Sequence, residues 1–224
     1  MAFWFALGLI AMIDSSTPGA APTIAHADYR FGYNTAAAES GPGTGTMSVD
    51  IGPAMADGGV MIRATDDWWN SVRPRATNSC EVYPNGNVSC LQRPYDLSPM
   101  QLVLFPMLGS NYFHGLGDAG NGSWTQSYRV SRGDIYFWDC VFKMTGSGLA
   151  KGATSVYGID VAGSASQIGG HYRSGDFKQH IDYDREVGLP AIVQDVHARL
   201  PQTSVYNQDY VELRLIGAMP AKTG

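Results

Sequence analysis

The amino-acid sequence predicts a mainly β protein: an antiparallel β-sandwich or jelly roll with one short helix near the C-terminus. Three observations support this fold class. A cysteine-bracketed hairpin lies in the first half of the chain, short runs of strand-forming residues recur between turn residues, and 27 Gly and 12 Pro residues supply the turns. With 224 residues, 44% of them hydrophobic, the chain can bury a substantial core.

The hairpin spans the segment from Cys80 to Cys90. Pro84 suits the first turn position and Gly86 suits a residue with positive φ, a combination typical of a three-residue loop with a G1 bulge. In the register that this loop sets, Cys80 lies opposite Cys90, and the Cα atoms come close enough for a disulfide. The disulfide indicates an oxidising compartment.

Further strands are predicted from alternating or β-branched runs. A loose N-terminal segment, residues 28–45, comes first and ends in a Gly/Pro linker. The expected strands are Thr46–Ile51, Gly59–Ala64, Ser79–Val82, Asn87–Leu91, Gln101–Phe105, Ser123–Val130, Asp134–Met144, Thr154–Val161, Gln167–Arg173 and Tyr210–Ile216. Asp134–Met144 is the strongest of these, because one of its faces is wholly apolar or aromatic. In the last strand, Val211, Leu213 and Leu215 should face the core.

One helix is predicted, at Pro190–Leu200. Its residues Ile192, Val193 and Val196 fall on one stripe at helical spacing, and prolines stand in its first turn and just after its end. A short helix of this kind would cover one edge or one end of the sheet.

The N-terminal residues 1–27 are expected to be a signal or leader segment, or else an apolar arm used in self-assembly. Ala2–Ile13 is an apolar run too short for a transmembrane helix, and Ala25-His26-Ala27 is typical of a signal-peptidase site. Residues 28–224 should then form a single β-sandwich domain. Together with the disulfide, the leader predicts a secreted, periplasmic or cell-surface location.

The composition narrows the class of partner. A net charge of −5 argues against a nucleic-acid partner, which would require a basic face. Charged residues make up only 16% of the chain, and Gly, Tyr and Trp are abundant. This composition is similar to that of small exported lectin-like and fimbrial adhesin domains, and no cofactor motif accompanies it.

The segment Asp66-Asp67-Trp68-Trp69-Asn70 is the most site-like part of the sequence. Side chains alternate along a strand, so two adjacent indoles cannot both face a core, and one of Trp68 and Trp69 should be exposed. An exposed indole beside the Asp67 carboxylate suits a sugar, because the ring stacks on a pyranose while the carboxylate binds hydroxyl groups. The alternative is a loop that buries both rings.

A second aromatic loop follows at Tyr112 and His114 and leads to Trp124 through a Gly-rich stretch. Mobile surface loops of this kind often carry binding residues. We expect Tyr112, His114 and Trp124 to line one rim of the sandwich together with Trp68 or Trp69. A plain connection between two strands is the alternative.

His180, Asp182 and Asp184 share one face if the segment is a strand. A histidine and two carboxylates could bind a divalent metal or act as an acid–base pair. The alternative is a solvated polar face with ion pairs to neighbouring basic residues. No further ligand stands at a recognisable spacing, so these residues are only weak candidates for a metal site.

The sequence therefore favours an exported binding module, adhesin- or lectin-like, that recognises carbohydrate or another surface ligand. Two alternatives stay open. One is a secreted polysaccharide hydrolase or lyase, in which Asp66, Asp67, His180, Asp182 or Asp184 would be the working groups. The other is a structural subunit of an extracellular filament or capsid that assembles through the N-terminal segment.

Overall fold

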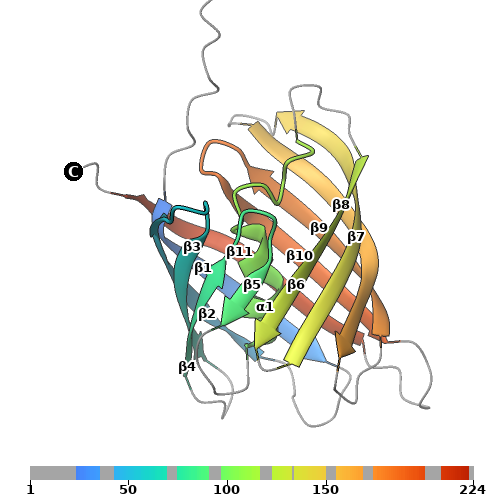
Figure 1. The fold of residues 1–224 in the computed structure, drawn as a ribbon, viewed down its shortest axis with the longest axis horizontal. Helices are drawn as coiled ribbons and strands as arrows, with labels where there is room; N and C mark the ends of the chain where they lie inside the picture. Colours follow the sequence, from blue (N-terminus) through green and yellow to red (C-terminus); the bar gives the residue numbers. More distant parts are fainter. Residues whose placement is uncertain are drawn as a thin grey trace, which may run out of the picture.

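In a computed structural model of the protein, the chain forms one mixed, mostly antiparallel sheet and one short helix, α1 (Figure 1). The structure describes residues 24–35, 43–69, 75–90, 97–116, 123–132, 134–149, 155–168, 174–199 and 208–221. The prediction of a mainly β protein is confirmed. The sandwich or jelly roll is not, because the strands belong to one continuous sheet instead of two packed layers.

The strands are long compared with those expected from the sequence, since many continue well beyond their apolar runs. In chain order they are β1 (Ile24–Thr35), β2 (Gly43–Ala54), β3 (Val60–Trp68), β4 (Ala76–Val82), β5 (Val88–Cys90), β6 (Ser123–Arg132), β7 (Asp134–Leu149), β8 (Ser155–Ile168), β9 (Ser174–Asp184), β10 (Leu189–Arg199) and β11 (Gln208–Pro220). The helix α1 is Pro99–Met107.

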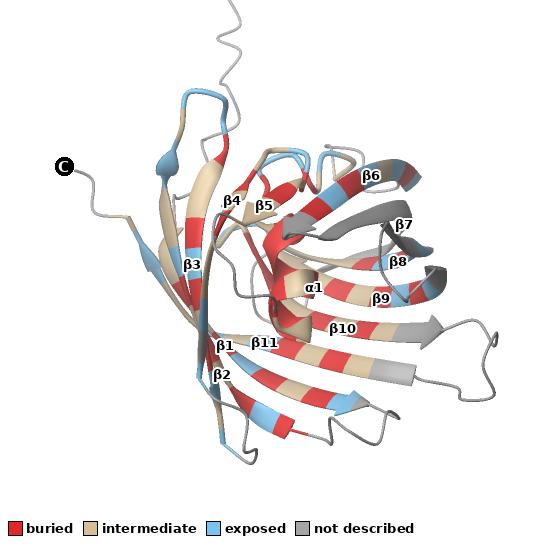
Figure 2. Ribbon diagram, turned by 60° about the horizontal axis from the view of Figure 1, so that its bottom comes forward, coloured by how far each residue is buried: buried red, intermediate tan, exposed pale blue. Residues whose placement is uncertain are grey.

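Neighbouring strands pair in the order β1-β11-β10-β9-β8-β7-β6-β5-β4-β3-β2, and β1 also pairs with β2, so the pairing order returns to the strand on which it begins. Every junction is antiparallel except β5–β6, which is parallel and joins only two residue pairs. A parallel junction requires a long crossover connection, and the segment that carries α1 provides it. Figure 2 shows the sheet curving around α1.

The helix α1 fills the concave side of the sheet. Seven of its nine residues are buried, and it contacts β1, β6, β10 and β11. A helix that is apolar nearly all round is stable only when it is enclosed in this way. Within the described residues, no helical segment has the length and hydropathy that a membrane-spanning helix needs.

The start of α1 is set by its sequence. Ser98 is the N-cap: its hydroxyl accepts a hydrogen bond from the Gln101 backbone N–H, and the Gln101 side chain accepts one from the Ser98 N–H. Pro99 occupies the first helical position, where its missing N–H costs nothing. This capping box explains why Gln101–Phe105, which was expected to be a strand, is helical instead.

The core consists of the inward-facing side chains of the strands and of α1. In β1, Tyr29 and Phe31 are buried against this core, while Arg30 is exposed on the outer surface. In β11, Val211 and Leu213 are buried, which confirms the predicted alternation of that strand.

The prediction of a helix at Pro190–Leu200 is wrong, because residues 190–199 lie in β10. The strand pairs with β9 and β11 on its two sides, and it buries Val193 and Asp195 on one face. An alternating pattern and a helical stripe both fit so short a segment, and the two neighbouring strands decide between them. The prediction of a loose segment over residues 28–45 is also wrong, because most of these residues lie in β1 and β2.

The predicted hairpin is confirmed. Val82 pairs with Val88 and Cys80 with Cys90, and the two cysteines form a disulfide. Gly86 has φ of 86°, as the bulged loop requires. The expected leader, residues 1–27, lies mostly outside the described residues, although 24–27 begin β1, so its removal stays a prediction.

Candidate functional site

The two adjacent tryptophans at the end of β3 have different environments. The Trp68 ring packs edge-on against Phe31 and Tyr33, with ring centroids 4.8 and 6.2 Å apart, so it belongs to the edge of the core. Trp69 is 49% exposed. The expectation that one indole of the pair is exposed is therefore confirmed, and the exposed indole is that of Trp69.

Trp69 lies on the outer surface of the sheet. Its backbone N–H donates to the Thr44 carbonyl oxygen, at 2.8 Å, which places it beside β2. The Arg30 side chain of β1 reaches toward the ring, and its Cζ atom lies 5.0 Å from the ring centroid. This cation–π contact holds the guanidinium and the indole next to each other on a solvent-exposed surface.

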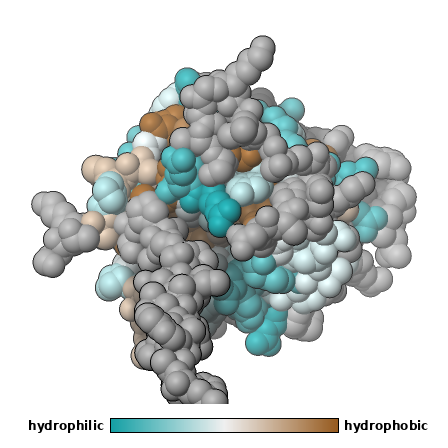
Figure 3. All heavy atoms as spheres, turned by 90° about the horizontal axis from the view of Figure 1, so that it is seen from above, coloured by the Kyte–Doolittle hydropathy of each residue, from teal (hydrophilic) through white to brown (hydrophobic). Residues whose placement is uncertain are grey.

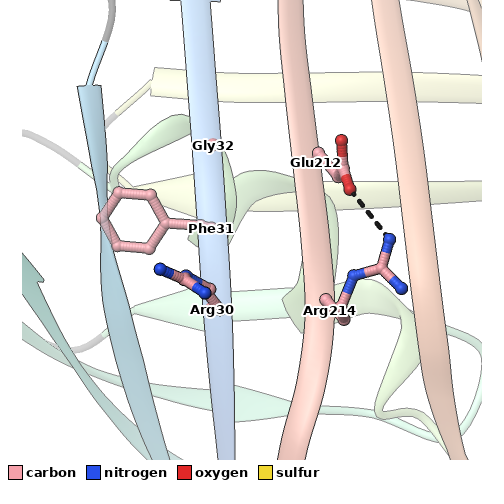
Figure 4. A pocket seen from close by; sticks show the side chains of 5 residues that line it. All are labelled: Arg30, Phe31, Gly32, Glu212 and Arg214. Atoms are coloured by element: carbon pink, nitrogen blue, oxygen red, sulfur yellow. Dashed lines mark hydrogen bonds and ion pairs between the residues drawn. The ribbon is translucent and has the colours of Figure 1, made fainter.

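A hollow of about 190 Å³ lies beside Arg30 (Figure 4). It is lined by residues of two neighbouring strands: Arg30, Phe31, Gly32, Glu212 and Arg214. Gly32 lies opposite Glu212 in the register, and a Cβ atom added to Gly32 would meet no atom within 4 Å. Because glycine has no side chain, the space above the Gly32 backbone is open and forms part of the hollow.

The charges around the hollow are unusual for paired strands. Arg30 and Arg214 are directly opposite each other across β1 and β11. Like charges in this position are destabilising. Glu212 offsets part of this repulsion, since its carboxylate accepts hydrogen bonds from Arg214 at 3.3 Å and from the Tyr210 hydroxyl at 3.1 Å. The hollow then carries two guanidinium groups and one carboxylate.

The second predicted group of aromatics lies around the β4–β5 hairpin turn. Tyr112 is fully buried, and its ring packs edge-on against Phe113 and Tyr128. Trp124 is 9% exposed, and only His114 of the predicted group is exposed to solvent. At this end of the molecule, viewed in Figure 3, the hydrophobic residues visible form small separate areas among hydrophilic ones. Most of this aromatic group therefore belongs to the core.

The two groups of aromatics do not share a rim, which corrects the prediction that they do. Trp68 is the last residue of β3 and pairs with Gly45, close to the start of β2. Trp124 is near the first residue of β6, where Gln126 donates to the Asn85 carbonyl of the hairpin turn. The hairpin turn and the end of β3 lie at opposite ends of the antiparallel strands. Among the described aromatic and histidine residues of the two groups, Trp69 is exposed at one end of the strands and His114 at the other.

His180 contacts two carboxylates on the outer surface. Its Nδ1 atom is 2.7 Å from Asp160, which lies opposite it on β8, and its Nε2 atom is 3.5 Å from Asp182. Asp184 is not part of this cluster, because its side chain accepts hydrogen bonds from the backbone of the following turn. Among the residues described, no group of three or more His, Cys, Asp or Glu side chains is placed to bind a metal ion.

The same arrangement occurs a second time, at His26. Its Nδ1 atom is 2.7 Å from Asp50 on β2, and its Nε2 atom is 3.2 Å from Asp28. The hydrogen bond to Asp50 raises the pKa of His26, although burial acts in the opposite direction. Ser48 donates to Asp28 at 2.6 Å and not to the imidazole, so the cluster lacks the serine–histidine contact of a nucleophilic site.

The carboxylates of Asp66 and Asp67 point to opposite sides of the sheet. Asp66 is fully buried on the concave side, where the Gln101 amide of α1 donates to its Oδ1 atom at 3.1 Å. Burial raises the pKa of Asp66 to about 6, despite hydrogen bonds from Ser98 and Gln101 that act to lower it. Asp67 is exposed on the outer surface. The two groups therefore cannot act as a pair on one substrate.

Sequence reasoning did not single out Arg30, Gly32 or Arg214. Each is unremarkable in its own strand, and they meet only because β1 pairs with β11. Comparison of the chain with models of known families, with curated proteins and with solved structures found no match. Any assignment of function therefore depends on the geometry of the chain itself.

Proposed function

We propose that this protein is an exported carbohydrate-binding module, lectin- or adhesin-like, that binds its ligand on the outer surface around Trp69. The observation that carries the proposal is the half-exposed Trp69 indole next to an open hollow lined by hydrogen-bonding side chains. We refer to this area as the Trp69 surface. Its residues are Trp69, Thr44, Arg30, Gly32, Glu212 and Arg214.

The chemistry of the Trp69 surface suits a sugar. An indole offers a large flat apolar face and loses little conformational entropy on binding. Guanidinium groups donate hydrogen bonds to sugar oxygens, and the Glu212 carboxylate accepts them from sugar hydroxyls. A ligand that is polar at its edges and has an apolar ring face matches both properties at once.

The two alternatives find less support. A hydrolase needs carboxylates facing each other across a groove, whereas Asp66 and Asp67 lie on opposite sides of the sheet. His180 and Asp182 lie in contact on β9, away from the hollow on β1 and β11. A filament or capsid subunit would assemble through the N-terminal residues before Ile24, which lie outside the described part of the chain.

A glycan array with matched variants tests the proposal. Trp69→Ala should weaken binding of the glycans that the parent protein selects by about 1–3 kcal/mol, the cost of losing one aromatic anchor. The melting temperature should barely change, because surface substitutions away from packed contacts usually alter stability by only about 0.5 kcal/mol.

Met219→Ala is the matched control. Met219 is 56% exposed and lies near the C-terminal end of β11, beyond the residues that line the hollow. Its truncation removes a comparable exposed apolar side chain and should leave binding unchanged. The proposal fails if the parent protein binds no glycan, or if Trp69→Ala and Met219→Ala bind as the parent does.

A further inference from the structure

We infer that the hollow between β1 and β11 is an anion subsite, and that the sugar it accepts carries a carboxylate: a hexuronate unit of an acidic glycan. This inference rests on the proposed function and specifies the ligand for the same surface. It depends on four side chains: those of Arg30 and Arg214, of Glu212 beside them, and of Trp69 at the margin.

The first argument is the pair of arginines. Arg30 and Arg214 are in register on adjacent strands, so their Cα atoms are separated by a single interstrand step. Both side chains are exposed on the same surface. Figure 4 shows the Arg30 side chain directed away from Arg214, and the hollow is lined by this pair and by the neighbouring pair of Gly32 and Glu212. A carboxylate placed there would relieve the repulsion between the two cations.

The second argument concerns the contacts that each arginine side chain already makes within the protein. Arg214 is bonded to Glu212 at 3.3 Å, so part of its hydrogen-bonding capacity is used. Arg30 packs against the face of Trp69. A guanidinium over an indole still presents N–H groups at its edge. Arg30 therefore can donate two parallel hydrogen bonds to a carboxylate, the geometry in which arginine binds this group best.

The third argument is the balance of charge and size. Two arginines and one glutamate give the hollow one net positive charge, which matches a sugar with one carboxylate. Asp67 is exposed on the same surface, but two strands away from Arg30, at about 10 Å. The volume of about 190 Å³ is below the range of roughly 300–1,000 Å³ that holds drug-sized ligands. A single sugar unit suits this hollow.

Glu212 fits the same ligand. Its Oε2 atom is fixed by the Tyr210 hydroxyl and its Oε1 atom by Arg214. A carboxylate held in this way would repel a densely charged polyanion, but it would accept hydrogen bonds from the hydroxyls of a uronate. The site therefore favours a sugar with one carboxylate and several hydroxyls over a heavily sulfated one.

Isothermal titration calorimetry with three probes tests the inference. The probes are tetragalacturonic acid, its methyl ester, which has the same backbone without the charge, and a sulfated galactose tetrasaccharide. The parent protein should bind the acid at least about tenfold more tightly than the ester at low salt, and this preference should shrink as salt is added. The sulfated probe should bind more weakly than the acid.

Three variants and one control locate the effect. Arg30→Gln and Arg214→Gln should each lower the affinity for the acid by about tenfold and the affinity for the ester by much less, because the ester loses only uncharged hydrogen-bond partners. Arg30→Lys keeps the charge but loses the two-pronged geometry, so its affinity for the acid should lie between that of the parent protein and that of Arg30→Gln. Arg129→Gln removes an exposed charge from β6, far from the hollow, and should have no effect.

The outcomes separate this inference from the proposed function. Equal binding of acid and ester, with both weakened by Trp69→Ala, would overturn the anion subsite and leave carbohydrate binding intact. Tighter binding of the sulfated probe than of the acid would overturn the assignment to a carboxylate. Failure to bind any of the three probes, combined with a blank glycan array, would overturn both.

Discussion

The buried carboxyl of Asp66 should make the protein less stable as the pH rises from 4 to 7. Its pKa of about 6 in the folded protein compares with 3.8 for an accessible carboxyl. Between these two values the unfolded chain has already lost the proton while the folded protein keeps it. The unfolded state therefore binds fewer protons, and the free energy of unfolding must fall as pH rises.

The magnitude follows from the difference between the two pKa values. At 1.36 kcal/mol for each pH unit, the total is about 3 kcal/mol, of which about 2–3 kcal/mol should be lost between pH 4 and pH 7. The loss comes from holding a charged group in the apolar interior, where the hydrogen bonds from Ser98 and Gln101 offset only part of the cost of burial. Below pH 3.8 the contribution of Asp66 to this pH dependence should vanish.

Asp66→Asn isolates this contribution, because it keeps the shape of the side chain and removes its titration. Urea unfolding at pH 4 and pH 7, with the disulfide intact, gives the free energy of unfolding of each protein. Relative to the parent, the variant should gain about 2–3 kcal/mol at pH 7 compared with pH 4. Asp67→Asn, at the exposed neighbour, is the control and should show no such change.

A difference between Asp66→Asn and the parent that is the same at both pH values would refute the reasoning. It would mean that the pKa of Asp66 is the same in the folded protein as in the unfolded chain. A difference of the opposite sign would mean that hydrogen bonds to the carboxylate outweigh its burial.

Three further predictions concern packing, the disulfide and the hollow. Trp68→Ala should cost about 2–3 kcal/mol of stability in a thermal melt, unlike the neighbouring Trp69→Ala, because only the first ring packs against the core. Replacing Cys80 and Cys90 together by Ala should cost about 2–3 kcal/mol, measured by urea unfolding, since a short loop is no longer closed in the unfolded chain; an unchanged midpoint would contradict this. Gly32→Val should fill the hollow, abolish the preference for an acidic sugar in calorimetry and leave the melting temperature equal or higher, because the added atoms meet no neighbour and valine favours strands.

Local features of the fold could be predicted from the sequence where turn chemistry decides them. The hairpin register and the Cys80–Cys90 disulfide follow from Pro84 and Gly86 alone. The capping box at Ser98 and Gln101 is also visible in the sequence. It indicates the start of a helix, whereas the β-like run that follows it suggests a strand.

Features that depend on distant pairing could not be predicted. The segment 190–200 fits a helix as well as a strand, and only its pairing with β9 and β11 makes it a strand. Buried Asp195 on the concave side accepts a hydrogen bond from Gln179 of β9, a partner that sequence alone does not place. For the candidate site, alternation predicted one exposed tryptophan, whereas the hollow beside it required knowledge of the β1–β11 register.

The pairing of the first described strand with the last one has a consequence for how the chain folds. Residue 31 lies opposite residue 213, so one hydrogen-bonding edge of β1 has no partner until the C-terminal strand has been synthesised. Contacts of such sequence separation slow folding, because a long loop must be ordered before they form. During synthesis the nascent chain therefore keeps an open, aggregation-prone edge until its last described strand pairs with β1.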